Sequence, residues 1–271
     1  MTIEISHESK TKPELCPRSS RRQQRTPLAP RKRQKTYPMF SSLKLHFGNM
    51  LLNKLFLPAP ELKMTPERAT EFDAQYEILQ TITKNEGSAY NCPYPKHEFL
   101  RYLVKEKNVL LHGSNHCELE KLIPKRQTDW NGKMMEAVFA SGDGIWPMFF
   151  ATVDHANYRG SLRNGCFVIS KEGLPENRYY FFSLNAEYRY KEIWRKGMIY
   201  VLPKDTFKKT DRGQIRLDEW ASEETIEPIA KLSISPQDFS FLHNVAWHDE
   251  NETIYLSWLR FKRRQQAMDE V

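Results

Sequence analysis

The chain has 271 residues, of which 39% are hydrophobic and 12% aromatic, enough for a sizeable core in one or two domains. Its formal net charge is +7. Residues 1–60 hold 12 Lys and Arg against 3 Asp and Glu, while the other residues hold 29 against 31. The basic character therefore belongs to the N-terminal segment, and charge does not indicate a nucleic-acid-binding role for the rest of the chain.

Several common classes of protein are not indicated. The cysteines are Cys16, Cys92, Cys117 and Cys166, and no two have the CxxC spacing of a zinc site or the density of a disulfide framework. No apolar run is long enough to span a membrane, and the first residues include Glu4, Glu8 and Glu14 instead of a secretory signal. Motifs for dinucleotide-binding, P-loop, zinc-protease and nucleophile-elbow sites are absent. We expect an intracellular protein with free thiols.

Residues 1–60 form a predicted disordered basic tail, because Pro, Ser, Gln and Arg dominate over apolar residues. Basic clusters at Arg21-Arg22 and 31–35 resemble a bipartite nuclear-import signal. A solvated tail and an arm that contacts nucleic acid or anionic lipid are the alternatives. Within the tail, residues 40–57 have helical apolar spacing and are expected to dock on the domain, with a partner or a membrane surface as alternatives.

Two helices are expected next, in a helical extension over residues 61–107. Thr65 and Pro66 are typical of a helix start, and this helix should run to about Lys84. A second helix is predicted from Pro95 to Lys107, with one apolar face.

After Asn108 the sequence predicts many short strands and few helices. The expected strands are Val109–His112, Ala137–Ala140, Cys166–Ile169, Tyr179–Leu184, Met198–Leu202, Ile215–Leu217 and Ile226–Ser235. Short helices are expected at Glu118–Ile123 and Ile145–Val153, and a basic C-terminal helix lies within 246–271, at Glu252–Met268. Such a pattern favours an α+β fold with a largely antiparallel or split sheet.

Three segments could carry chemistry. In the first, a strand ends in His112, Gly113 and Ser114; a histidine can donate to a ribose hydroxyl, and glycine allows close backbone approach by a ligand. In the second, Phe139 lies on a strand that leads to the aromatic Trp146, Phe149 and Phe150, which either sandwich a flat ring or belong to the core. In the third, Glu219 lies near the end of a strand, where a carboxylate could stabilise positive charge at an anomeric carbon, while Glu223 and Glu224 suit a solvated turn.

Taken in order, these segments resemble the ADP-ribosyltransferase fold of diphtheria toxin and the poly-ADP-ribose polymerases. The pattern resembles still more that of small, mostly bacterial proteins with this fold, which have His-Gly-Ser, Val-Phe-Ala, Tyr-Val-Leu-Pro and Glu-Trp-x-Ser segments. The resemblance covers about residues 108–240, and we assign residues 108–245 to the domain.

The resemblance implies NAD as a substrate, with its nicotinamide–ribose bond cleaved and ADP-ribose transferred to a protein or nucleic-acid acceptor. His112 would bind the adenosine ribose, Gly113 would pair with the nicotinamide amide, and Phe139 would stack on nicotinamide with Ser114 beside it. Glu219 would orient the nicotinamide ribose and favour an oxocarbenium-like transition state. An enzyme of this kind requires His112 and Glu219 on opposite walls of one pocket that contains Phe139, and side chains separated by the sheet would contradict the enzymatic function.

The chain departs from the family at two positions. Phe139 replaces the tyrosine of the polymerases, and Leu217 occupies the place where arginine-modifying relatives have Gln or Glu. The Arg-rich pattern expected for transfer of an RNA 2′-phosphate is not evident. The alternative function is an inactive ligand-binding domain or a protein- or nucleic-acid-interaction module.

Overall fold

The computed structural model describes residues 50–81, 90–129, 132–170, 176–211 and 215–269. They belong to one unit, Met39–Val271. The fold is α+β, as the sequence predicted, and the described strand pairs are antiparallel except that β12 runs parallel to β6. The basic clusters of the predicted tail lie outside the described residues.

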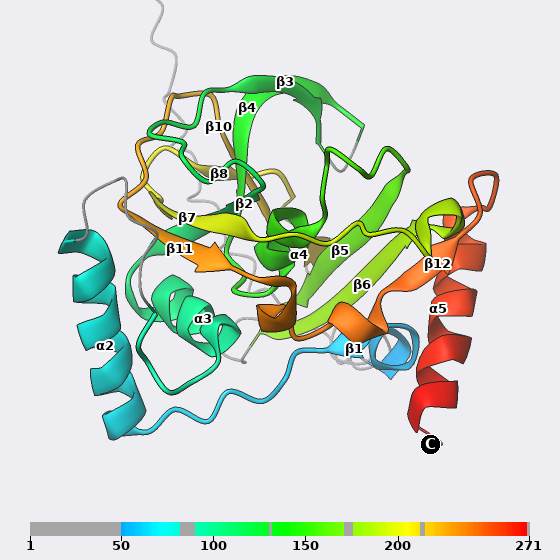
Figure 1. The fold of residues 1–271 in the computed structure, drawn as a ribbon, viewed down its shortest axis with the longest axis horizontal. Coiled ribbons are helices and arrows are strands. Elements are labelled where there is room, and N and C mark those ends of the chain that lie inside the picture. Colours follow the sequence, from blue (N-terminus) through cyan, green and yellow to red (C-terminus); the bar gives the residue numbers. More distant parts are fainter. Residues whose placement is uncertain (1–49, 82–89, 130–131, 171–175, 212–214, 270–271) are drawn as a thin grey trace, which may run out of the picture. The chain divides into compact units, whose positions relative to one another are not determined.

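The strands form two sheets (Figure 1). The first has the order β11-β7-β2-β4-β10-β8, with β3 also paired to β4. Its strands are β2 (Val109–Ser114), β3 (Lys125–Thr128), β4 (Met134–Ser141), β7 (Gly197–Pro203), β8 (Lys208–Lys209), β10 (Glu219–Ser222) and β11 (Ala230–Ile234). The second has the order β1-β6-β5-β9, with β12 also on β6. Its strands are β1 (Leu57–Pro58), β5 (Leu162–Ile169), β6 (Asn177–Asn185), β9 (Ile215–Leu217) and β12 (Ala246–His248).

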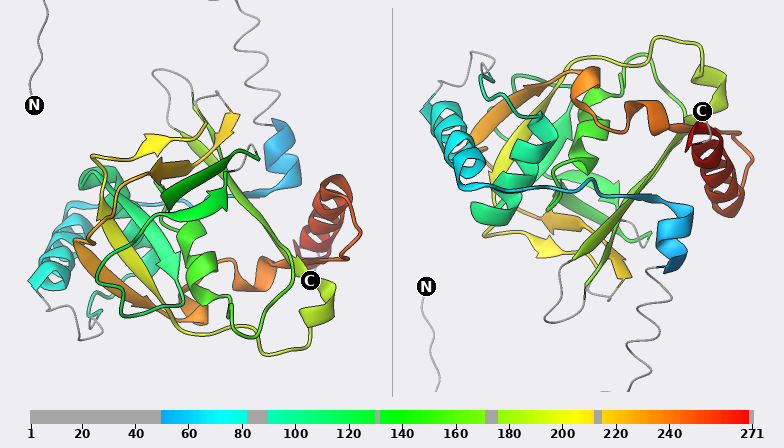
Figure 2. Two further views of the ribbon diagram at one scale, coloured as in Figure 1. Left: turned by 90° about the horizontal axis from the view of Figure 1, so that it is seen from above. Right: turned by 90° about the horizontal axis from the view of Figure 1, so that it is seen from below.

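The helices are α2 (Pro66–Thr81), α3 (Lys96–Glu106), α4 (Trp146–Thr152) and α5 (Ile254–Asp269). Three one-turn helices are η1 (Ala186–Tyr188), η2 (Pro236–Asp238) and η3 (Leu242–Asn244). The hydroxyl of Thr65 accepts from the backbone N–H of Arg68 at 3.3 Å, as the predicted start of α2 requires. Figure 2 shows α2 and α3 at one end of the domain and α5 at the other.

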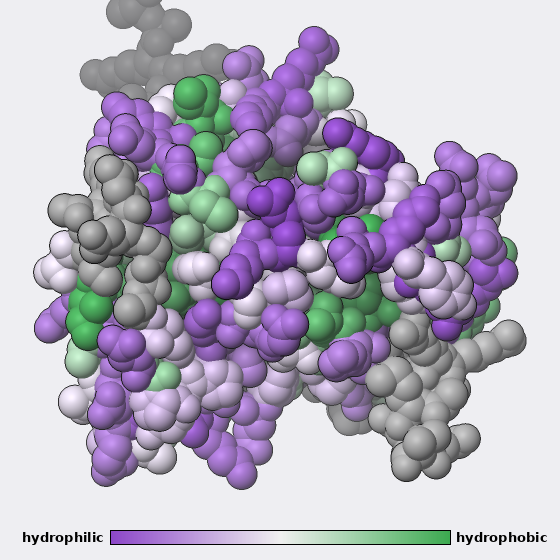
Figure 3. Space-filling model, viewed as in Figure 1, coloured by the Kyte–Doolittle hydropathy of each residue, from purple (hydrophilic) through white to green (hydrophobic). Residues whose placement is uncertain are grey.

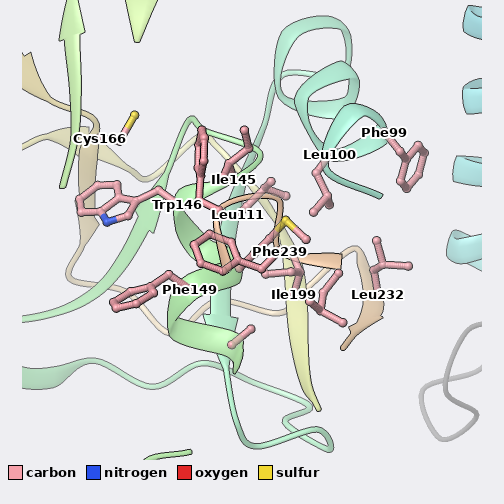
Figure 4. Packing of buried hydrophobic residues seen from close by; sticks show 14 of the residues in the cluster. Phe99, Leu100, Leu111, Ile145, Trp146, Phe149, Cys166, Ile199, Leu232 and Phe239 are labelled. Carbon is pink, nitrogen blue, oxygen red and sulfur yellow. The ribbon is translucent and has the colours of Figure 1, made fainter. Parts of the chain in front are cut away.

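Alternation along the strands separates the cores. On β6, Tyr180 and Phe182 point into the main cluster between the two sheets, whereas Tyr179 and Phe181 face a smaller cluster under α5. The main cluster also takes residues from α3, α4 and the first sheet (Figure 4). On the face seen in Figure 3, hydrophilic side chains predominate and the hydrophobic groups form small separate patches.

Three boundaries differ from the predictions. Residues 118–123 are not helical, because Leu122 instead bridges to Ile226 and is buried in a third cluster. Residues 50–60 do not extend the predicted tail: 50–55 are helical, β1 pairs with β6, and Phe56 is buried, so this part docks on the domain as expected. The segment 246–271 begins with strand β12 before its helix.

Gly113 is required by the packing of α4 on the sheet. A Cβ atom at this position would lie 1.9 Å from the carbonyl oxygen of Pro147, in the first turn of α4. We therefore expect Gly113→Ala to lower the free energy of unfolding by about 3 kcal/mol, measured by urea denaturation. Gly165→Ala is the control, because its Cβ would come close only to the side-chain tip of Leu217, at 2.9 Å, with the ring of Phe167 at ordinary contact distance, 3.5 Å, and its loss should be smaller. Equal losses would contradict this role of Gly113.

Candidate functional site

The three segments singled out in the sequence lie on neighbouring strands. His112 is on β2, Phe139 on β4 and Glu219 on β10, and the sheet order places β4 between the other two. The pairing of β2 with β4 is limited to Leu111 opposite Ser141, whereas β10 pairs with β4 along four residues. The sheet is therefore split beyond Leu111, next to His112.

Phe139 and Glu219 share one face of the sheet. Glu219 pairs with Ser141 and Ala221 pairs with Phe139, so these four side chains point the same way. Phe139 is partly exposed and belongs to none of the three buried clusters. A partly exposed aromatic ring beside a carboxylate is an arrangement that can stack a flat ligand and stabilise positive charge.

His112 does not share this face. By alternation from Leu111 it points to the other side of the sheet, where its ring centroid lies 6.4 Å from that of Tyr200. Its Nδ1 lies 2.7 Å from the carbonyl oxygen of Phe139, which joins the ring to β4 across the split. His112 and Glu219 therefore lie on opposite sides of the sheet, and the expectation that they form two walls of one pocket is wrong. This separation counts against the enzymatic role that the resemblance assigns to His112. Burial lowers the pKa of His112, so its ring is neutral at pH 7.

The structure uses Gly113 and Ser114 differently from the expectation. On the face of the sheet where a side chain would point, the backbone of α4 fills the space beside Gly113, so on this face a helix and not a ligand approaches the glycine closely. The hydroxyl of Ser114 accepts from the backbone N–H of His116 at 3.1 Å and stabilises the turn after β2. Alternation places Ser114 on the face opposite Phe139.

Glu219 is the first residue of β10, at the point where the chain passes from the second sheet to the first. β9 pairs with β5, β10 pairs with β4, and only Asp218 separates β9 from β10. The backbone N–H of Asp218 donates to the carbonyl of Cys166 at 3.0 Å, which fixes the crossing. The Oε1 atom of Glu219 accepts from the hydroxyl of Thr210 at 2.9 Å. Glu219 is thus held at the junction of the two sheets.

A buried ionic network supports this junction, and the sequence analysis missed it. Arg178 of β6 donates to Asp218 at 2.5 Å and lies 3.5 Å from Asp143, whose side chains are 4% and 1% exposed. Asp143 also accepts from the backbone N–H groups that begin α4, and from Tyr180 at 2.7 Å. The indole of Trp220 donates to Asp218 at 3.1 Å. Both neighbours in sequence of Glu219 are therefore anchored.

Ser141 and Cys166 are two further residues near Glu219 and the junction of the two sheets. The hydroxyl of Ser141 is buried and, within the described part of the chain, has no hydrogen-bond partner, although Ser141 lies opposite Glu219 in the register. Such a group is costly unless a water or ligand pairs with it. Burial, with the carboxylate of Asp143 nearby, raises the pKa of the Cys166 thiol, so it is protonated and is not an activated nucleophile.

The aromatic residues after β4 are mainly core. Trp146 and Phe149 are 7% and 0% exposed, and Phe150 packs at the border of the main cluster. Glu223 and Glu224 are exposed, as expected for a solvated turn. Among the described residues, no three His, Cys, Asp or Glu side chains gather as metal ligands, and no helix has the length and apolarity to cross a membrane.

We compared the chain with protein families, curated proteins and solved structures. No family model, curated protein or solved structure matches the chain. The motif order and the geometry of β2, β4 and β10 are therefore the features that indicate a function.

Proposed function

We propose that the face of β4 and β10 binds NAD, and that the protein is an ADP-ribosyltransferase-like enzyme with the corresponding split-sheet fold. The observation that carries the proposal is the pairing of β4 with β10, which brings Phe139 and Glu219 to one face at the junction of the two sheets. In this proposal Phe139 stacks on nicotinamide. Glu219 orients the adjoining ribose and stabilises the charge that develops as nicotinamide leaves.

The split beside His112 supports a place for the carboxamide. Residues 112–114 have no register partner on β4, so backbone groups along this edge of β2, at Gly113, could pair with a carboxamide. The buried hydroxyl of Ser141 offers a further group to a ligand on the Glu219 side. His112 would reach the ligand only from the edge of the split, and its bond to Phe139 supports the strand that carries the stacking ring.

The test is titration with NAD followed by measurement of nicotinamide release. We expect Glu219→Gln to keep NAD binding and to lower the release rate about 100-fold or more, because it removes a charge that acts mainly in the transition state. Glu223→Gln is the matched control on an exposed turn and should leave the rate unchanged.

Each outcome decides between the functions. Nicotinamide release that Glu219→Gln does not lower would remove Glu219 from the reaction. Binding of NAD without release would favour the alternative of a ligand-binding domain. Purified protein that neither binds NAD nor releases nicotinamide would contradict the proposal.

A further inference from the structure

Two lysines flank the ring of Phe139 on its own face of the sheet. Lys208 of β8 pairs with Ala221 of β10, and Ala221 pairs with Phe139 of β4, so these three residues form one row across three strands. On the other side of β4, Lys125 of β3 pairs with Ala137, two residues before Phe139. Directly paired residues, and residues two apart on a strand, point to the same face. The face therefore has cations on both sides of one aromatic ring.

Both lysines are available to an anion. Lys125 and Lys208 are exposed, and neither makes an ion pair with any residue that the structure describes. Between them, Ala221 is small and leaves the ring of Phe139 without a bulky neighbour in the row. Glu219 places one carboxylate on this face, diagonal to Lys208 and hydrogen-bonded to Thr210. Its single charge does not offset two ammonium groups.

One further observation indicates a ligand at this place. The buried hydroxyl of Ser141 has no partner in the described part of the chain, and alternation puts it on the same face, two residues after Phe139.

We propose that Lys125 and Lys208 hold the phosphate groups of a nucleotide whose ring stacks on Phe139. The inference rests on the proposed function and deepens it, because it names the residues that would select a phosphorylated ligand over a free base. Each lysine acts as a point charge toward phosphate oxygens. The phosphate groups of a nucleotide carry enough negative charge to pair with both ammonium groups.

The two strands provide matched controls. Arg126 pairs with Glu136 and follows Lys125, so it points to the opposite face of β3. Lys209 follows Lys208 and lies with its Nζ 5.0 Å from the ring centroid of Trp220, on the opposite face of β8. Replacing Arg126 and Lys209 therefore removes the same charge from the same two strands without changing the Phe139 face.

The experiment is calorimetric titration of the full chain with ADP and, separately, with nicotinamide. We expect Lys125→Gln combined with Lys208→Gln to weaken ADP binding about tenfold or more at low salt, with a smaller effect at high salt. Nicotinamide binding should be unchanged, and Arg126→Gln combined with Lys209→Gln should keep ADP affinity within about twofold.

The outcomes separate this inference from the proposed function. ADP binding that both double variants weaken equally, or that neither weakens, overturns the assignment of Lys125 and Lys208. NAD cleavage with unchanged ADP affinity in the Lys125/Lys208 variant overturns the phosphate subsite and leaves the transferase. Lysine-dependent ADP binding without NAD cleavage supports the subsite and overturns the transferase. No binding of ADP or NAD overturns both.

Discussion

Replacing Arg178 by Met should lower the free energy of unfolding by about 3–5 kcal/mol, measured by urea denaturation at pH 7. Arg178 neutralises Asp218 and Asp143, and both carboxylates are nearly inaccessible to water. Without the guanidinium, two like charges would remain buried at the junction between the sheets. Burial alone would lower the pKa of Arg178, yet the surrounding carboxylates raise it, so this arginine stays charged.

Asp218→Asn tests whether the unpaired charge is the cause. If it is, Arg178→Met combined with Asp218→Asn should be more stable than Arg178→Met alone, which a double-mutant cycle measures. Arg195→Met is the control, because Arg195 is about half exposed and lies 3.6 Å from Asp154, and it should cost less than about 1 kcal/mol. A loss at Arg178 no larger than that at Arg195 would mean that the network is not important for stability.

Much of the fold follows from local patterns in the sequence. Short runs of apolar, β-branched and aromatic residues predicted β2, β4, β5, β6, β7, β9 and β11, and the cap at Thr65 predicted the start of α2. The helix expected at 118–123 was wrong because its residues are held by long-range contacts: the bridge of Leu122 to Ile226, and the hydroxyl of Tyr200, which accepts from the backbone N–H of Leu119. β3 and β8 were missed because they are short and carry mainly charged or polar residues.

The candidate site could be predicted only in part. Motif order selected Phe139 and Glu219, and strand pairing places them on one face. Motif order could not give the face of His112, because one residue along a strand reverses the direction of a side chain. The ion pair of Arg178 and Asp143 could not be predicted from the sequence, because the two residues are 35 positions apart and meet only in the folded protein. Asp218 was visible beside Glu219 in the sequence, but its role depends on the crossing between the sheets.

His248 joins three segments of the second sheet. Its Nε2 lies 2.6 Å from the hydroxyl of Ser161, before β5, and its Nδ1 lies 2.8 Å from the hydroxyl of Ser183 on β6. The residue is fully buried at the end of β12. Burial, with the charge of Arg163 adding to it, lowers the pKa of His248 to about 4. A proton on the ring would therefore be disfavoured in the folded protein.

This depressed pKa predicts a loss of stability in mild acid. Above pH 6.5 the ring is neutral in both states, and below it the unfolded chain takes up a proton that the folded protein does not. The free energy of unfolding should therefore fall as the pH falls from about 6.5 to about 4, by about 3 kcal/mol in total. His112 has a lowered pKa for the same main reason and adds to the slope with the same sign.

His248→Gln separates the contribution of this ring from the others. Glutamine does not titrate, so the variant should be less stable at pH 7 but should lose less stability between pH 7 and pH 5 than the wild type. Urea denaturation at half-unit steps of pH gives both slopes. The comparison stops at pH 5 because carboxylates with lowered pKa, such as those of Asp154 and Asp238, lose their charge only in stronger acid. Parallel slopes in the two proteins would show that Ser161 and Ser183 hold a ring that can accept a proton in the folded state, and the acid sensitivity would then have to arise elsewhere.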